Sequence, residues 1–227
     1  MYYSNYCRSD GIGSHARLKI VCRKTWEFDS PLRHLQLKTL SKNKKLQAYV
    51  IGLSIGDGNL SNPNGRAVRL RITCDKNYPL LLKEVMHSIQ KLLPQNKVSI
   101  IKRKGCFDVS CYSNQWEKIL EWKAKGGSKI KQNVRIPDWI KKEKAYIKEC
   151  LRGLFQTDGS IYKDRKYTMV NFVTEIPILA KDVVKMIQAI GYKPNLQKIK
   201  SKNQTKFTIR LSRDSKKFIN DINLWKK

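Results

Sequence analysis

Two nine-residue stretches of the chain, VIGLSIGDG (Val50 to Gly58) and LRGLFQTDG (Leu151 to Gly159), follow one pattern. Each is an apolar, helix-like run with a glycine, and an Asp-Gly pair begins five residues after that glycine. Asp57 lies in the first half of the chain and Asp158 in the second, so the pattern indicates an internal repeat. We therefore expect two related halves, each built around one of these stretches.

The composition indicates a partner with many negative charges. The 227 residues include 47 Lys and Arg against 18 Asp and Glu, which gives a formal net charge of +29. A folded protein tolerates such an excess best when it binds a polyanion, so nucleic acid is the first candidate and an anionic membrane surface the second. Hydrophobic residues make up 41% of the chain, enough for a proper core, and no apolar run approaches the length of a membrane-spanning helix.

The pattern of apolar residues predicts the same order of elements in both halves. Each half reads α-β-β-α-β-β-α if the segment after its motif turns back from a short strand, as at 59–65. In the first half we expect helices and strands at 45–56, 66–74, 79–93, 98–103, 106–112 and 114–123. In the second half we expect them at 147–157, 167–174, 177–190, 196–200, 206–211 and 215–225.

The remaining segments suggest where the halves begin and end. Residues 1–42 are basic without clear periodicity, and we interpret them as an N-terminal extension with one short helix near 31–40. The first half then covers 43–125, a Lys-rich linker covers 126–144, and the second half covers 145–227. Trp139 and Ile140 indicate that part of the linker packs against the protein.

The aspartates occupy an unfavourable place for a negative charge. Gly52 and Gly153 each cost about 1 kcal/mol inside a helix relative to alanine, which makes sense where another backbone must come close. Gly58 and Gly159 suit a left-handed stop after a helix, which puts both aspartates at helix C-termini, where the macrodipole is already negative. If the helices pack together, two carboxylates converge, and hard divalent cations such as Mg²⁺ would stabilise them. The alternative is a simple turn after a buried helix, and its repetition in both halves argues against that.

The two motifs resemble those of the LAGLIDADG homing endonucleases in the single-chain form with two motifs, over residues from about 44 to the end. The first copy departs from the family pattern at 54–56, and the second has Arg152 and Gln156 at variable positions. The resemblance implies an α/β (α+β) fold of two pseudo-symmetric αββαββα halves, with curved antiparallel sheets and a central two-helix interface. It also implies that Mg²⁺, for which Mn²⁺ can substitute, is held by Asp57 and Asp158 with the backbone carbonyls of Gly56 and Thr157.

The resemblance also implies further residues around the metal-bound water. A lysine after the last helix of the first half is expected, either Lys129 or Lys131, and we choose Lys131 as the catalytic one. Asp75 and Glu175, at equivalent strand ends, are expected to shape the water pocket. The alternatives are a solvated charge or phosphate contact for the lysine and a turn or helix-cap role for the two acids.

Alternation along the strands gives each sheet a polar face that could lie in the major groove of DNA. The alternative is an ordinary solvated sheet face. Candidate DNA-binding residues are Arg69, Arg71, Thr73, Ser110 and Tyr112 in the first half and Asn171, Thr208, Arg210 and Ser212 in the second.

These observations favour a monomeric, Mg²⁺-dependent DNA endonuclease that cuts both strands of a long asymmetric target. The resemblance implies that the cut is staggered and that the genetic setting is a mobile intron or intein. An intron-borne or free-standing gene is expected, because splicing-type flanking sequence is absent. The alternatives are an RNA-binding intron maturase, a non-catalytic DNA-binding regulator on the same fold and, more remotely, a basic ribosomal-type protein. The six cysteines, none in a CxxC pair, and the lack of an apolar N-terminal leader indicate an intracellular protein, organellar or from a bacterial cytoplasm.

Overall fold

The structure is a computed structural model that describes residues 43–200 and 204–226. The expected N-terminal extension and its short helix near 31–40 lie outside the described residues. Among the described residues, the four cysteines Cys74, Cys106, Cys111 and Cys150 are free. No helix in this part of the chain has the length and apolar character needed to cross a membrane.

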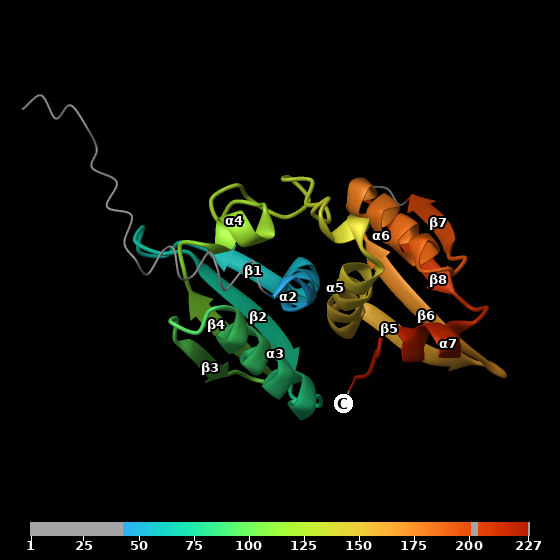
Figure 1. The fold of residues 1–227 in the computed structure, drawn as a ribbon, viewed down its shortest axis with the longest axis horizontal. Coiled ribbons are helices and arrows are strands. Elements are labelled where there is room, and N and C mark those ends of the chain that lie inside the picture. The colour runs from blue at the N-terminus through green and yellow to red at the C-terminus, as the bar shows by residue number, and fades with distance from the viewer. Residues whose placement is uncertain (1–42, 201–203, 227) are drawn as a thin grey trace, which may run out of the picture.

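The first half forms one four-stranded antiparallel sheet with helices on one face (Figure 1). Its strands lie in the order β1-β2-β4-β3, so the second strand pairs with the fourth in the middle of the sheet. The elements are α2 (Lys44–Asp57), β1 (Gly58–Ser61), β2 (Arg69–Asp75), α3 (Pro79–Leu92), β3 (Val98–Lys102), β4 (Cys106–Tyr112) and α4 (Trp116–Leu120).

The second half repeats this arrangement, with strand order β5-β6-β8-β7. A short 3-10 helix, η1 (Ile140–Lys142), precedes it. Its elements are α5 (Lys144–Thr157), β5 (Gly159–Asp164), β6 (Tyr167–Thr174), α6 (Pro177–Ala189), β7 (Asn195–Lys200), β8 (Thr205–Leu211) and α7 (Ser215–Asp221). The predicted mixed fold of two αββαββα halves with antiparallel sheets is therefore confirmed.

The differences from the expected elements are local. The helix expected at 114–123 is shortened because Glu121 takes a left-handed conformation, with φ of 62°, directly after Leu120. The helix expected at 215–225 ends at Asp221. The linker does pack in part, since Ile136 and Ile140 are buried and the Trp139 ring meets Tyr146 edge-on at 5.5 Å.

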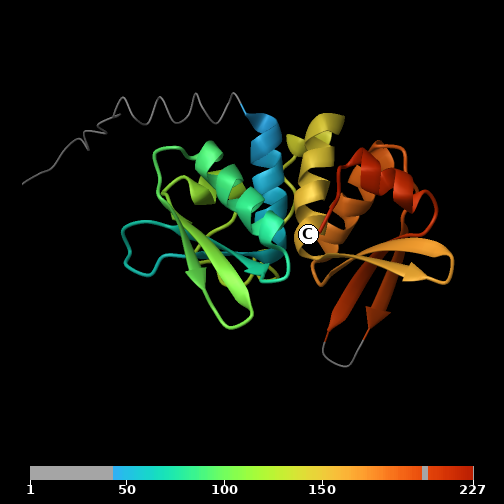
Figure 2. The ribbon, with the colours of Figure 1, turned by 90° about the horizontal axis from the view of Figure 1, so that it is seen from below.

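Helices cover one face of each sheet (Figure 2). In β2 the buried and half-buried residues alternate, and Leu70 and Ile72 point into the core. The facing helix α3 contributes Val85 and Ile89, which are completely buried. None of the helices in residues 43–200 and 204–226 covers the opposite face of either sheet, so its side chains are available to a partner.

The helices α2 and α5 lie side by side at the centre of the molecule, as expected (Figure 1). A Cβ atom at Gly52 would lie 2.2 Å from the carbonyl oxygen of Cys150, and one at Gly153 would lie 2.4 Å from that of Tyr49. Both distances are far too short for any side chain, so the two backbones touch through their glycines. The two glycines thus set how close the helices approach.

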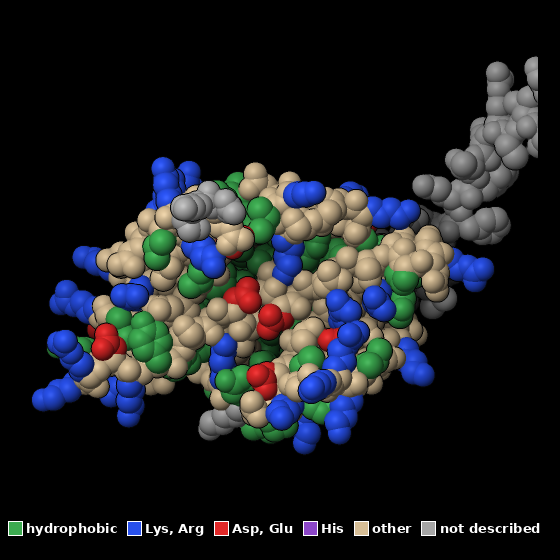
Figure 3. Space-filling model, turned by 180° about the vertical axis from the view of Figure 1, so that it is seen from behind, with side chains coloured by type: hydrophobic (Ala, Val, Ile, Leu, Met, Phe, Trp, Pro, Cys, Tyr) green, Lys and Arg blue, Asp and Glu red, His purple; other side chains and the backbone are tan. Residues whose placement is uncertain are grey.

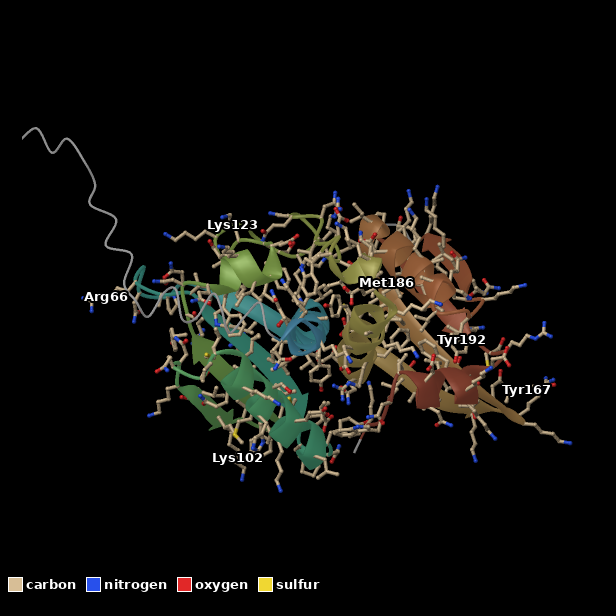
Figure 4. All side chains as sticks on the ribbon, in the orientation of Figure 1. Arg66, Lys102, Lys123, Tyr167, Met186 and Tyr192 are labelled. Carbon is tan, nitrogen blue, oxygen red and sulfur yellow. The ribbon has the colours of Figure 1, made fainter. Side chains whose placement is uncertain are left out.

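The hairpins that follow the central helices extend in opposite directions. Arg66, in the turn between β1 and β2, and Tyr167, at the start of β6, lie at opposite ends of the molecule (Figure 4). The result is an elongated body with the two central helices in its middle and one sheet on either side (Figure 2).

Candidate active site

The two aspartates lie where the central helices end. Asp57 is the last residue of α2, and Asp158 follows the last residue of α5. The helix ends meet, because a Cβ atom at Gly56 would lie 1.9 Å from Oγ1 of Thr157 and 3.4 Å from the carboxyl carbon of Asp158. The expected convergence of the two acids at two negative helix ends is therefore present in the structure.

The glycines after the aspartates act differently from our expectation. Gly58 has φ of −80° and ψ of 147°, so the backbone is extended and the predicted left-handed stop is wrong. The chain instead passes directly from α2 into β1, and likewise from α5 into β5. A Cβ atom would lie 2.3 Å from the Ser54 carbonyl oxygen at Gly58 and 2.5 Å from that of Phe155 at Gly159, which explains why glycine occupies both positions.

The protein surroundings make the charged form of these carboxylates unfavourable. Partial burial raises the pKa of Asp57, against the opposing effect of Lys129 and Lys226. Partial burial, followed by the charge of Asp57, raises the pKa of Asp158 to about 6. Two crowded carboxylates with raised pKa values are typical of a site that binds a cation.

Two lysines reach the same helix ends from the segments that follow the last helix of each half. Lys129 Nζ donates to the carbonyl oxygens of Ser54 at 3.3 Å and Ile55 at 2.6 Å, and also to that of Gly56. Lys226 Nζ donates to the carbonyl oxygen of Thr157 at 3.1 Å and to that of Gly159. Burial lowers the pKa of both lysines, while the two aspartates oppose that change.

The structure changes our choice of lysine. Lys131 is exposed, and its backbone N–H donates to the hydroxyl of Ser128, whereas the ammonium group of Lys129 is at the site. The structure therefore brings Lys129, rather than the Lys131 that we chose, to the helix ends. The two lysines are two residues apart in an irregular segment, where no periodic pattern in the sequence indicates which way a side chain points.

Sequence reasoning missed Lys226, although a signal was available. Lys129 follows α4 and Lys226 follows α7, so the two lysines hold related places in the repeat. Applying the rule for the first half to the second half would have found Lys226.

The oxygen atoms at this site suit a hard divalent cation. No three His, Cys, Asp or Glu side chains of the described residues form a group that could hold a metal ion. A cation held by Asp57 and Asp158 would therefore need further oxygen ligands from backbone, water or a bound phosphate, which is how Mg²⁺ is commonly bound. The carbonyls of Gly56 and Thr157, which we expected as ligands, accept hydrogen bonds from the two lysines in this structure.

The two acids expected around the water pocket have different surroundings. A carboxylate oxygen of Asp75 accepts the backbone N–H of Asn77 at 2.8 Å, so Asp75 stabilises the turn before α3. Glu175 lines a pocket of about 370 Å³ together with Asp158 and Lys129. The structure thus brings Glu175 to the edge of the site and gives Asp75 the turn role that was the alternative.

The candidate DNA-binding residues lie on the uncovered sheet faces, although they are not equally accessible. In the pairing of β2 with β4, Arg71 lies opposite Ser110, and in the pairing of β6 with β8, Asn171 lies opposite Arg210. Ser110 and Thr208 are buried among their neighbours, so the prediction that they face a partner directly is not supported. The more accessible candidates are Arg69, Arg71, Thr73, Tyr112, Asn171, Arg210 and Ser212.

The charge on this side of the molecule is strongly patterned. Figure 3 shows the molecule from behind, with Lys and Arg side chains around the outer parts of the face and several acidic side chains near its middle. This pattern fits a surface that attracts a polyanion and holds cations at its centre.

Two family models match the chain, one in each half. A LAGLIDADG-like domain model matches residues 145–223, and a WhiA LAGLIDADG-like domain model matches residues 46–121. Together they cover more than half of the chain, and each covers one motif. The chain is therefore a LAGLIDADG protein with two motifs in a single chain.

Solved structures agree with this assignment at the level of the fold. A structure of mesophilic variants of the homing endonuclease I-DmoI has a TM-score of 0.61 and 18% identity, covering 80% of this chain and 97% of that chain. The homing endonuclease I-WcaI bound to its DNA recognition sequence has a TM-score of 0.56 and 15% identity, covering 86% and 88%. The N-terminal LAGLIDADG domain of DUF199/WhiA has a TM-score of 0.54 and 14% identity, covering 87% and 94%.

One curated protein also matches in sequence. The tRNA-splicing ligase RtcB of Methanopyrus kandleri is 24% identical over 190 residues, which are 71% of this chain. The chain spans only 19% of the length of that protein.

Proposed function

We propose that this protein is a divalent-metal-dependent DNA endonuclease that makes a staggered double-strand break at a long, asymmetric target, acting as a monomer. Its genetic setting would be the mobile intron expected from the sequence or, because this chain matches a segment of a much longer ligase, an intein carried inside another protein.

The observation that carries this proposal is the convergence of two acids and two lysines at the end of the central helix pair. Asp57 comes from the first half and Lys129 from the linker that follows it, whereas Asp158 and Lys226 come from the second half. Each helix end thus receives one carboxylate and one ammonium group. A site that is doubled about the centre suits a reaction on two antiparallel strands.

The residues of the chain could divide the work as follows. The two carboxylates would bind Mg²⁺ or Mn²⁺, which when bound would make a water molecule a better nucleophile and stabilise charge on the phosphate. Lys129 and Lys226 would stabilise negative charge that develops on the phosphate oxygens. Glu175, on the rim of the 370 Å³ pocket, would orient water there.

The related endonuclease structures support the choice of partner and metal. One I-DmoI structure is in complex with DNA and Mn, and another is in complex with DNA and Ca. The +29 net charge of this chain also suits a long contact with phosphates.

A non-catalytic DNA-binding role is the second candidate, because the first half matches the WhiA-type domain model. The two functions differ in what they require of the helix ends. A binding protein needs the basic face but has no use for a pair of acids that cost stability there, so the intact pair favours cleavage.

The test uses the full chain and a random duplex library. Duplexes retained in EDTA are isolated, and the bound site is then incubated with Mg²⁺, Mn²⁺ or Ca²⁺. We expect both strands to be cut at offset positions with Mg²⁺ and Mn²⁺, and little or no cutting with Ca²⁺. Retention of a specific duplex without cutting under any of these conditions would favour the WhiA-like binding role.

A further inference from the structure

One carboxylate lies on the DNA-facing side of the first sheet, outside the metal site. Asp108, in the middle of β4, has a side chain that is only 3% exposed. Oδ1 of Asp108 accepts the hydroxyl of Thr73 at 2.8 Å, and Oδ2 forms an ion pair with Nε of Arg103. A terminal nitrogen of Arg71 lies 3.9 Å from Oδ2.

This arrangement leaves two guanidinium groups at the surface, each in an ion pair with Oδ2 of Asp108, an oxygen that accepts no hydrogen bond among the described residues. The Arg103 side chain is 52% exposed and that of Arg71 is 31% exposed, although both contact the same buried carboxylate. A guanidinium group carries five N–H donors in a planar fork, so neither contact uses them all. Nε of Arg71 is itself buried and has no hydrogen-bond partner among the described residues. The donors that remain for a ligand are the terminal N–H groups on the exposed parts of the two side chains.

A buried carboxylate has a cost on such a surface. It repels phosphates, and it loses hydration unless its ion pairs compensate. If the residue at this position had no role in recognition, a neutral side chain would pack here at a lower cost in free energy. The presence of Asp108 is best explained if fixing the two arginines matters for what they contact.

The second half has no such cluster at the equivalent positions. The registers equate Asp108 with Thr208 and Thr73 with Val173, because Thr73 pairs with Asp108 and Val173 pairs with Thr208. In the same way, Arg71 pairs with Ser110 and Asn171 pairs with Arg210.

Apolar side chains occupy part of this face in the second sheet. Arg103 corresponds to Ile199, because each is bonded across its hairpin at the equivalent place. Val173 is 44% exposed and Ile199 is 56% exposed.

We infer that Asp108 is a positioning residue that holds Arg71 and Arg103 to read guanine in one half-site, while the second sheet, where Thr208 replaces the carboxylate beside Arg210, reads A·T pairs through Val173, Ile199 and Asn171. The inference rests on the proposed DNA target. Arginine forks pair with the O6 and N7 acceptors of guanine, asparagine pairs with adenine, and apolar groups contact the thymine methyl. The two sheets therefore differ in the bases they prefer as well as in the order of those bases.

A positioning role predicts an unusual response to Asp108→Asn. The change removes one negative charge from a DNA-facing surface, so affinity for non-specific duplex should stay the same or rise. The arginines lose the anchor that fixes their direction, so preference for guanine should fall about tenfold, within the range that one bidentate contact supplies. A merely structural role would lower both quantities together.

The experiment selects binding sites from a random duplex library in EDTA, so that cleavage plays no part. The full-length wild-type protein is compared with Asp108→Asn and with Thr208→Val, the control at the equivalent position of the second half. An Asn171→Ala variant identifies the half-site that the second sheet contacts. Base preference at each position, the dissociation constant for a non-specific duplex and the melting temperature are measured for every variant.

We expect Asp108→Asn to reduce guanine preference in the half-site that Asn171→Ala leaves unchanged, with Thr208→Val causing no such loss there. A wild-type site without guanine in that half, or parallel loss of guanine preference and non-specific affinity, would overturn the inference while leaving the DNA target intact. Failure of the wild-type protein to retain any specific duplex would instead refute the proposed function, and this inference with it.

Discussion

The two sheets have the same strand order but carry different side chains at equivalent positions. β2 presents Arg69, Arg71 and Thr73 where β6 presents Met169, Asn171 and Val173, an equivalence that the pairing of β1 with β2 and β5 with β6 now fixes. The shared backbone therefore does not impose a shared chemistry on the exposed face. A symmetric scaffold can carry two unlike recognition surfaces.

The central helices show the same contrast on a smaller scale. Arg152 of α5 lies over the ring of Tyr49 at 4.0 Å, and it donates to Glu84 of α3 at 2.8 Å. The Tyr49 hydroxyl donates to Gln156 at 2.7 Å. On α2, the motif positions that match Arg152 and Gln156 hold Ile51 and Ile55, both buried. The matched positions of α2 therefore do not repeat these polar contacts between the halves.

The ends of the helices are where the halves are most alike. Each end has an aspartate, a following glycine and a lysine that donates to the last carbonyls. This likeness predicts equal roles for the matched residues, and substitutions in pairs can test it.

Neutralising either aspartate should have the largest effect. Asp57→Asn or Asp158→Asn should lower double-strand cleavage by about 1,000-fold or more, because several kcal/mol of charge stabilisation are lost. DNA binding should stay within about tenfold, since affinity comes mainly from phosphate contacts. Cleavage rates and dissociation constants on one selected duplex measure both. Full cleavage by either variant would refute the assignment of the acids.

Removing either lysine should have the next largest effect. Lys129→Met and Lys226→Met should each reduce the cleavage rate by about 100-fold, the loss typical of one group that stabilises developing charge. Lys131→Met is the matched control, because Lys131 is exposed and lies two residues from Lys129, with its backbone N–H bonded to the hydroxyl of Ser128. A control that lost as much activity as Lys129→Met would restore Lys131 as the catalytic lysine.

Substitution of either glycine at the contact between the central helices should lower the stability of the protein by a similar amount. Gly52→Ala and Gly153→Ala should each lower the free energy of unfolding by about 2 kcal/mol, because the added methyl meets backbone atoms that cannot move aside easily. Urea unfolding of the metal-free protein at neutral pH would measure the loss. A large loss at one glycine and none at the other would show that the helix pair is not symmetric at its contact.

The pH dependence of stability should give the smallest effect. The pKa of Asp158 in the fold is about 6, above the ordinary value of 3.8, so its charge destabilises the metal-free fold at neutral pH. That destabilisation shrinks as the pH falls from about 6 to about 4 and is absent below, where folded and unfolded chains both bind the proton.

Asp158→Asn should therefore melt a few degrees higher than the wild type at neutral pH in EDTA. The difference should vanish near pH 4. Thermal melts of both proteins across this range provide the measurement, and a gain that grew toward acid pH would contradict the raised pKa.

Much of the fold could be predicted from the sequence because its periodic patterns are strong. The alternation at Leu70 and Ile72 and the helical spacing of Val85 and Ile89 are local signals, and the repeat doubled the evidence for each element. The connections between elements were harder to predict. Gly58 looked like a left-handed stop, but its backbone is extended because a strand follows the helix without a turn.

The site was predictable only where the repeated motif marked it. Asp57 and Asp158 stand in the motif, whereas Lys129 and Lys226 belong to irregular segments that reach the helix ends only in three dimensions. The burial of Asp108 beneath two arginines also depends on neighbouring strands, so the pattern along one strand could not show its partners.

The glycine-to-backbone contact between α2 and α5 has a consequence for how such a protein could be altered. The distance between the two helix ends is fixed by main-chain atoms, which no exchange of exposed sheet residues disturbs. Retargeting the protein to a new sequence would therefore leave the cutting centre in place. The helix pair would keep the two aspartates in place while the exposed residues of either sheet are exchanged.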